Sequence, residues 1–208
     1  SLGEVPIGLT VAWFRPFPGA EVWPWILAAG GTHFFYKTFL TFAYDRGDLS
    51  RVYPIARGAA PMVVTVVGIF TLPDAITAHQ YGGIFLLGLG ILLMARGVFQ
   101  RGEDRKLLPF ALGSAIATAT YTLLDGLGAR VSGDAAGYVA WVFVVDDALF
   151  ATVTLLWRGV NILPRDLRSW RLGLVAAGAS FGAYAVSIWA MTFAPIAVVA
   201  ALRETSIL

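Results

Sequence analysis

Long apolar stretches dominate this chain, and short polar or proline-containing segments separate them. A helix that crosses a bilayer needs about 20 mostly apolar residues. The pattern predicts helices over the ranges 23–44, 51–72, 80–95, 107–124 and 136–157, a further helix that ends near Thr192, and partial helices at 2–13 and 195–208. The sequence therefore predicts an all-α polytopic membrane protein.

The composition supports that class and argues against others. Hydrophobic residues make up 58% of the chain and charged residues only 13%, whereas a soluble domain carries about 25% charged residues. The chain has no cysteine, which excludes disulfides and thiolate metal sites. Its basic residues fall in short loops between apolar runs, so we expect no nucleic-acid partner. No phosphate-binding loop, zinc motif or nucleophile elbow is present, and we predict neither enzymatic activity nor a cofactor.

The chain also contains an internal duplication. When the sequence is aligned with itself at an offset of about 148 residues, the polar residues of one helix match those of a later helix. At the same offset, and to within one residue, the segment around Arg57 matches the segment around Glu204. The first match lays Gly30, Thr32 and Tyr36 over Gly178, Ser180 and Tyr184. Repeats with interrupted helices are the usual construction of secondary transporters. We predict a first repeat over residues 1–98 and a second over residues 107–208.

Both ends of the chain fall inside predicted helices. The charge-free run 172–202 is 31 residues long and is divided by Pro195, so the last helix begins near that proline and stops after about 14 residues. Applying the offset of about 148 predicts that helices are missing at both ends. The expected complete protein has ten spans in two inverted repeats of five, with its first and final helices absent from this chain.

Ionisable and aromatic residues inside the apolar helices are the candidate substrate site, because charge at membrane depth is costly and marks pathways by default. Arg57 lies between two prolines that free backbone carbonyls. The predicted substrate-binding residues are His33, Tyr36, Lys37, Tyr53, Arg57, Tyr121, Tyr184, Trp189, Arg203 and Glu204.

Each of these residues also has a structural interpretation that the sequence leaves open. Lys37 could extend its long stem to the interface. Arg57 and Glu204, at corresponding places in the two copies, could form a buried ion pair that only fixes the packing. His33 could be a neutral polar group bonded to a neighbouring helix, and the aromatic residues could simply pack.

Adjacent carboxylates in the helix at 136–157 are the candidates for proton coupling. An aspartate at the centre of a span costs about 2.5–3.5 kcal/mol on insertion scales, so Asp146 and Asp147 together need a compensating role or partner. We predict that Asp146 or Asp147 carries the proton, with Glu204 as the main rival; a polar seam bonded to other helices is the alternative. Asp125 is expected to cap the far end of the helix at 107–124.

Three segments carry a resemblance to a known family. GDLSRVYPIARGAAP (47–61), ATYTLLDGLGAR (119–130) and VVAALRETSIL (198–208) resemble signature segments of EamA-type transporters in the drug/metabolite transporter superfamily. The resemblance covers nearly the whole chain. It implies a ten-helix fold of two inverted repeats around a central cavity that moves small metabolites, often outward. The Asp146 and Asp147 pair is not part of that family pattern.

The loop charges predict the orientation in the membrane. Ten basic residues follow the second, fourth and sixth predicted helices, against Arg15 and Arg130 on the other side. Loops rich in basic residues usually face the cytoplasm, so these loops are predicted to be cytoplasmic. Ten-helix members of the family generally have both chain termini in the cytoplasm, and that topology would instead place the loop at 96–106 outside. We expect a multi-pass protein of a bacterial-type inner (plasma) membrane, a monomer or weak homodimer whose partners are lipid and a small-molecule substrate.

A second class of function competes with transport. Seven or so visible spans and the intramembrane Lys37 also suit a membrane-embedded enzyme or a retinal-type photoreceptor. The prolines after the helix of Lys37 and the duplication are features that retinal proteins lack. The main prediction is therefore a secondary transporter of small, amphipathic metabolites or drugs that works by alternating access and is coupled to protons for export.

Overall fold

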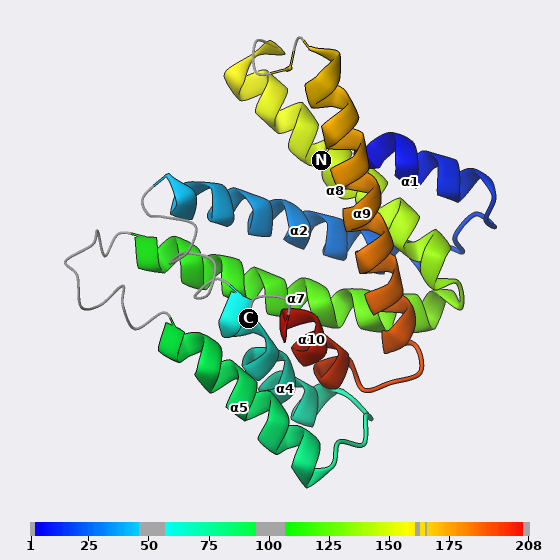
Figure 1. Ribbon diagram of the computed structural model, residues 1–208. Helices are drawn as coiled ribbons and strands as arrows, with labels where there is room; N and C mark the ends of the chain where they lie inside the picture. Colours follow the sequence, from blue (N-terminus) through cyan, green and yellow to red (C-terminus); the bar gives the residue numbers. More distant parts are fainter. Residues whose placement is uncertain (1–2, 46–56, 95–106, 161–162, 165, 206–208) are drawn as a thin grey trace. The chain divides into compact units, whose positions relative to one another are not determined.

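The computed structural model describes residues 3–45, 57–94, 107–160, 163–164 and 166–205, and this part of the chain is entirely helical with no strand (Figure 1). The all-α prediction is confirmed, while the ten-helix arrangement stays a prediction. The helices are α1 (Glu4–Trp13), α2 (Trp23–Tyr44), α4 (Ala60–Thr71), α5 (Ala78–Met94), α7 (Leu107–Ser132), α8 (Ala135–Arg158), α9 (Leu167–Met191) and α10 (Ile196–Glu204).

Local capping signals begin several of these helices. Before α5, the backbone N–H of Thr77 donates to Gln80 Oε1 at 2.8 Å, and the N–H of Gln80 donates back to Thr77 Oγ1 at 3.4 Å, a reciprocal capping box. Asp134 and Asp166 cap α8 and α9 by accepting backbone N–H bonds three residues on. These side chains satisfy donors that a helix start leaves without intrahelical partners.

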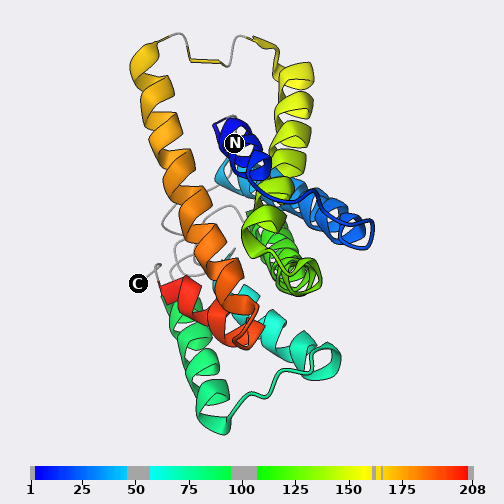
Figure 2. The ribbon, with the colours of Figure 1, turned by 90° about the vertical axis from the view of Figure 1, so that its right-hand side faces the viewer.

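The described chain divides into two compact units, and α2 and α7 each contribute residues to both. Unit 1 comprises Ser1–Phe34 and Leu124–Thr192. In it α8 and α9 run antiparallel to each other (Figure 2), and α1 contacts both. A Cβ atom on Gly8 of α1 would lie 2.9 Å from the backbone oxygen of Ala140. Only glycine allows α1 to approach α8 this closely.

Unit 2 comprises Phe35–Leu123 and Phe193–Leu208. Its helix α10 packs against α4 and α5 (Figure 1). The carboxylate of Asp74, between α4 and α5, accepts the backbone N–H of Ile196 at 2.9 Å and so holds the first turn of α10. The short α10 is therefore fixed at its start by a side chain from the α4–α5 connection.

The predicted ranges differ from the structure mainly at one helix end. The structure reproduces 23–44 as α2. The helix predicted over 51–72 is described as α4 from Ala60 to Thr71, and its predicted first residues, 51–56, lie outside the described part of the chain. The other predicted helices shift by a few residues. The exception is α7, which continues to Ser132, so the prediction that Asp125 caps its far end is wrong. Asp125 lies inside the helix and is fully buried.

Two helices of the described chain, α8 and α9, are long and apolar enough to cross a bilayer. On length and composition alone this is weak support for membrane association. Large apolar side chains also point outward from several helices, among them Phe70 of α4, Leu86 of α5, Leu156 of α8 and Val175 of α9. The predicted multi-pass topology goes beyond this support.

Candidate functional sites

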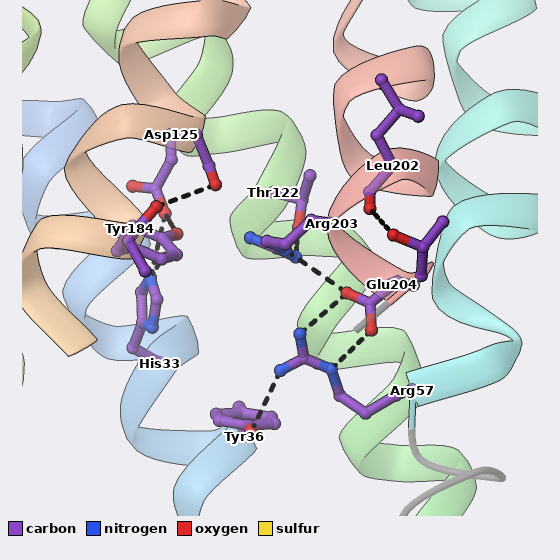
Figure 3. A network of polar contacts seen from close by, with 12 residues as sticks. His33, Tyr36, Arg57, Thr122, Asp125, Tyr184, Leu202, Arg203 and Glu204 are labelled. Carbon is purple, nitrogen blue, oxygen red and sulfur yellow. Dashed lines mark hydrogen bonds and ion pairs between the residues drawn. The ribbon is translucent and has the colours of Figure 1, made fainter. Parts of the chain in front are cut away.

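Two buried polar clusters occupy these largely apolar helices, one in each unit (Figure 3). The first, the Asp125 cluster, comprises His33, Asp125, Tyr138 and Tyr184 and lies within unit 1. The second, the Arg57 cluster, comprises Tyr36, Arg57, Tyr121, Thr122, Arg203 and Glu204 and lies within unit 2. Each cluster draws its residues from at least three separate stretches of the chain.

Three side chains from different helices contact the carboxylate of Asp125, which is 0% exposed. His33 Nε2 lies 2.9 Å from Asp125 Oδ2, and the Tyr138 hydroxyl donates to Oδ1 at 3.1 Å. The Tyr184 hydroxyl donates to Oδ2 and lies 3.2 Å from His33 Nε2. A buried carboxylate is costly unless hydrogen bonds compensate it, and here α2, α8 and α9 each supply one.

Glycine and aromatic packing set the positions of these side chains. A Cβ atom on Gly128 would lie 2.5 Å from the Tyr138 hydroxyl and 2.6 Å from its ring carbons. The Tyr138 ring thus occupies space against α7 that any other residue at 128 would fill. The Tyr184 ring packs edge-on against His33 and Phe143 at centroid distances of 5.5 and 5.4 Å.

The Arg57 cluster is built around a bidentate ion pair. Arg57 Nε donates to Glu204 Oε2 at 2.9 Å and Arg57 Nη2 donates to Oε1 at 2.8 Å. The Glu204 side chain is 1% exposed and that of Arg57 is 14% exposed. Fork-to-fork pairing of this kind is the strong geometry for arginine and carboxylate. The ion pair expected as one possibility from the duplicated positions is formed.

A second guanidinium faces the same carboxylate. Arg203 Nε lies 3.3 Å from Glu204 Oε1, and Arg203 Nη2 donates to Thr122 Oγ1 at 3.2 Å. The Arg203 guanidinium carbon also lies 5.9 Å from the centre of the Tyr121 ring, within the range of a cation–π contact. The described cluster therefore holds two positive charges against one negative charge.

Tyrosines border this charged group. Arg57 Nη1 donates to the Tyr36 hydroxyl at 3.5 Å, and the rings of Tyr36 and Tyr121 meet edge-on at 5.5 Å. One and two turns of α7 before Thr122, the hydroxyls of Thr118 and Ser114 are also fully buried. Neither makes a hydrogen bond to any residue that the structure describes. Buried polar groups are normally bonded, so these two hydroxyls are exceptions within the described part of α7.

The structure divides the predicted substrate residues between the units. Tyr36, Arg57, Tyr121, Arg203 and Glu204 come together in unit 2, and His33 and Tyr184 come together in unit 1. Lys37 is partly buried in unit 2. Trp189 is 57% exposed on α9. Tyr53 lies outside the described residues.

The predicted proton carriers Asp146 and Asp147 are both buried on α8. Gly30 of α2 lies against this part of α8, because a Cβ atom there would be 3.4 Å from the backbone nitrogen of Asp146. Their role in proton coupling stays a prediction. No group of three His, Asp or Glu side chains in the described part of the chain is arranged to hold a metal ion.

Three residues of the clusters are absent from the predicted site residues: Asp125, Thr122 and Tyr138. Asp125 carries the clearest signal, since it is a carboxylate set among apolar and small residues. The glycines that follow it, at 126 and 128, resemble a helix stop, and this resemblance favours a cap over a buried site residue. Thr122 and Tyr138 carry no signal that separates them from packing residues.

No family model, curated protein or solved structure matches this chain in the comparisons with known proteins.

Proposed function

We propose that this chain belongs to a secondary transporter that moves small amphipathic metabolites across a bacterial-type inner membrane, built as in the EamA-type transporters that its sequence segments resemble. The observation that carries the proposal is the buried Arg57–Glu204 pair with Arg203 beside it. Charges inside apolar helices are expensive and mark substrate or ion pathways. The outward-facing apolar side chains of α4, α5, α8 and α9 are suited to lipid.

The charge balance of the Arg57 cluster favours an anionic group on the substrate. Two guanidiniums, those of Arg57 and Arg203, lie beside the Glu204 carboxylate. A carboxylate or phosphate can take a guanidinium in the same forked geometry that Glu204 uses. The neighbouring rings of Tyr36 and Tyr121 suit a flat or apolar body attached to that group.

Transport by alternating access needs a site that binds and releases its ligand. In the proposed cycle the substrate anion competes with Glu204 for Arg57 and Arg203, so binding exchanges one set of charge-assisted bonds for another. Such an exchange keeps the guanidiniums compensated in both states. The buried hydroxyls of Ser114 and Thr118 supply polar partners for the rest of the substrate.

Paired substitutions separate this function from a purely structural ion pair. Removing one partner of a buried pair costs about 3–5 kcal/mol, whereas replacing both by apolar residues of similar volume is often neutral. Because Arg203 also faces the Glu204 carboxylate, we expect Glu204→Leu to lower the unfolding temperature and the triple variant Glu204→Leu with Arg57→Met and Arg203→Met to restore it. Transport should be lost in both variants, by about 100-fold or more.

The measurement begins with the purified protein and a panel of amino acids, nucleosides, carboxylates, polyamines and organic cations. Compounds that raise the unfolding temperature are then followed as radiolabelled flux into vesicles. Arg158→Met serves as the control because Arg158 is exposed and lies over its neighbour Trp157. Flux at wild-type rates in the triple variant would make the ion pair structural. A visible absorbance band in the purified protein would favour the photoreceptor alternative.

A further inference from the structure

We infer that His33 and Asp125, held by Tyr138 and Tyr184, form a buried proton-binding site, and that this site couples the proposed transporter to the proton gradient. Its coupling role rests on the proposed function, whereas its proton chemistry does not. The inference places the proton at a histidine–aspartate pair in unit 1 instead of at the predicted carriers Asp146, Asp147 and Glu204.

The hydrogen-bond pattern identifies the nitrogen that takes up the proton. An ionised carboxylate only accepts hydrogen bonds, so opposite an ionised Asp125 the hydrogen of the neutral His33 ring is assigned to Nε2, which lies 2.9 Å from Asp125 Oδ2. Nδ1 of the neutral ring is then the nitrogen with the lone pair. Proton uptake forms one N–H bond at Nδ1 and breaks no bond between the four side chains of the cluster.

The proton changes the charge of a buried group. With neutral His33 the four side chains carry the single negative charge of Asp125, and with protonated His33 they form a neutral imidazolium–carboxylate pair. Imidazole is the side chain that ordinarily changes charge between pH 5 and 8. The two states therefore differ in the cost of removing the cluster from water, as a conformational switch driven by protons requires.

The Asp125 carboxylate is hydrogen-bonded in both protonation states of His33. Tyr138 donates to one oxygen of Asp125, and Tyr184 donates to the other. These two hydrogen bonds remain when His33 releases its proton, so the tyrosine hydroxyls stabilise the negative charge of Asp125 in both states.

Other titratable groups lie on the elements packed around this site. Arg130 of α7 donates to the carbonyl oxygen of Met191 at 2.8 Å, and Asp134 before α8 lies 3.6 Å from a guanidinium nitrogen of Arg15. Glu4 of α1 and the pair Asp146 and Asp147 of α8 are buried in the same unit. Within the described part of the chain, the side chains that hydrogen-bond to Asp125 are those of His33, Tyr138 and Tyr184.

The histidine content makes the site directly measurable. The chain has two histidines, and the other, His79, is exposed at the start of α5. In a His79→Gln background, NMR of the imidazole carbon and nitrogen nuclei reports His33 alone, in the full chain in lipid nanodiscs. The probe is the proton itself. We expect the His33 signals to change reversibly between pH 5 and 8.

Substitutions then test the partner. Asp125→Asn should lower the proton affinity of His33 by about tenfold or more, because it removes the negative charge beside the imidazolium. Tyr138→Phe should change the affinity less and serves as a milder variant where Asp125→Asn unfolds. Asp166→Asn, the same change at an exposed helix cap, should leave the titration of His33 unaltered.

Constant His33 signals across this pH range in the folded protein would overturn the inference, as would an unchanged titration in folded Asp125→Asn and Tyr138→Phe. Neither result needs a substrate, so it leaves the proposed transport standing. Conversely, His33 could titrate as expected while the protein moves no compound of the panel. That result would support the proton-binding site and contradict the proposed transport function.

Discussion

Gly128 shows how a single residue without a side chain sets the geometry of the Asp125 cluster. Its missing Cβ leaves the space that the tip of the buried Tyr138 ring occupies, and from there the hydroxyl reaches Asp125. Glycine inside a helix costs about 1 kcal/mol relative to alanine. The chain accepts that cost at the one turn of α7 where a tyrosine must approach the helix backbone.

We predict that Gly128→Ala destabilises the protein by about 1–3 kcal/mol, because overpacking and the lost Tyr138–Asp125 bond outweigh the gain in helix propensity. Thermal unfolding in detergent measures the change. Gly182→Ala is the matched control, since a Cβ atom at Gly182 of α9 meets nothing within 4 Å. That control should be neutral or stabilising by up to about 1 kcal/mol. Equal behaviour of the two variants would contradict the close packing of Tyr138.

At the scale of the helix, Asp166 at the start of α9 ties stability to pH. Its Oδ1 accepts the backbone N–H of Ser169 at 2.7 Å. This hydrogen bond from the helix N-terminus lowers the pKa of the exposed Asp166 carboxyl below its usual value of 3.8. A depressed pKa means that the ionised cap stabilises the folded state above the unfolded-state pKa, and that this contribution is lost as the pH falls through the folded-state pKa.

We predict that Asp166→Ala lowers the unfolding temperature at pH 7 and that the difference from the wild type shrinks below about pH 4. Asp166→Asn should retain most of the cap and lose its pH dependence, since asparagine caps helices well without titrating. Unfolding followed by circular dichroism at pH 7 and pH 3 compares the three proteins. A difference between wild type and Asp166→Ala that stays constant over this range would show that the carboxylate charge plays no part.

The helices show what can be predicted from the sequence and what cannot. Apolar length and prolines locate α2, α8 and the start of α10 within a residue or two, because these signals are local. The sequence pattern misplaces the end of α7 at Asp125, because glycines that stop one helix can instead admit a ring from another. The residues around such a glycine do not show whether it ends its helix or makes room for a ring from another helix. Only the position of Tyr138, 13 residues further along, decides between them.

The partners within the clusters are harder to predict than the residue types. A charged or polar side chain inside an apolar segment is enough to indicate Arg57, His33 and Glu204 as candidate site residues. That His33 pairs with Asp125, 92 positions away, depends on which faces of α2 and α7 meet. Helical periodicity gives the residues that share a face but not the helix that the face contacts. The duplication helps only where both partners occupy equivalent positions, as Arg57 and Glu204 do.

At the scale of the whole molecule, the two candidate spans make a prediction about sidedness. If α8 and α9 both cross the bilayer, their connection at residues 159–166 lies on one side and the turn before α8 lies on the other. The basic residues near that connection, such as Arg158 and Arg168, predict that it faces the cytoplasm.

The absence of cysteine from the chain makes single-cysteine labelling a clean test of this topology. We predict that a membrane-impermeant maleimide labels Val131→Cys from outside intact cells and labels Val160→Cys only after the membrane is opened. Both positions are exposed in the structure. The wild-type chain should take up no label under either condition. Labelling of both variants from the same side would show that α8 does not cross the membrane.

The ion pair between Arg57 and Glu204 has a consequence for how the protein is made. Its partners are 147 positions apart, and a ribosome adds about 5–20 residues per second. Roughly 7–30 s of synthesis therefore separate the appearance of the guanidinium from that of its carboxylate. If the chain is inserted into a membrane as it is made, Arg57 stays at the bilayer edge, or in the insertion machinery, until α10 is translated. The contact between Arg57 and α10 therefore forms only after residue 204 has been translated.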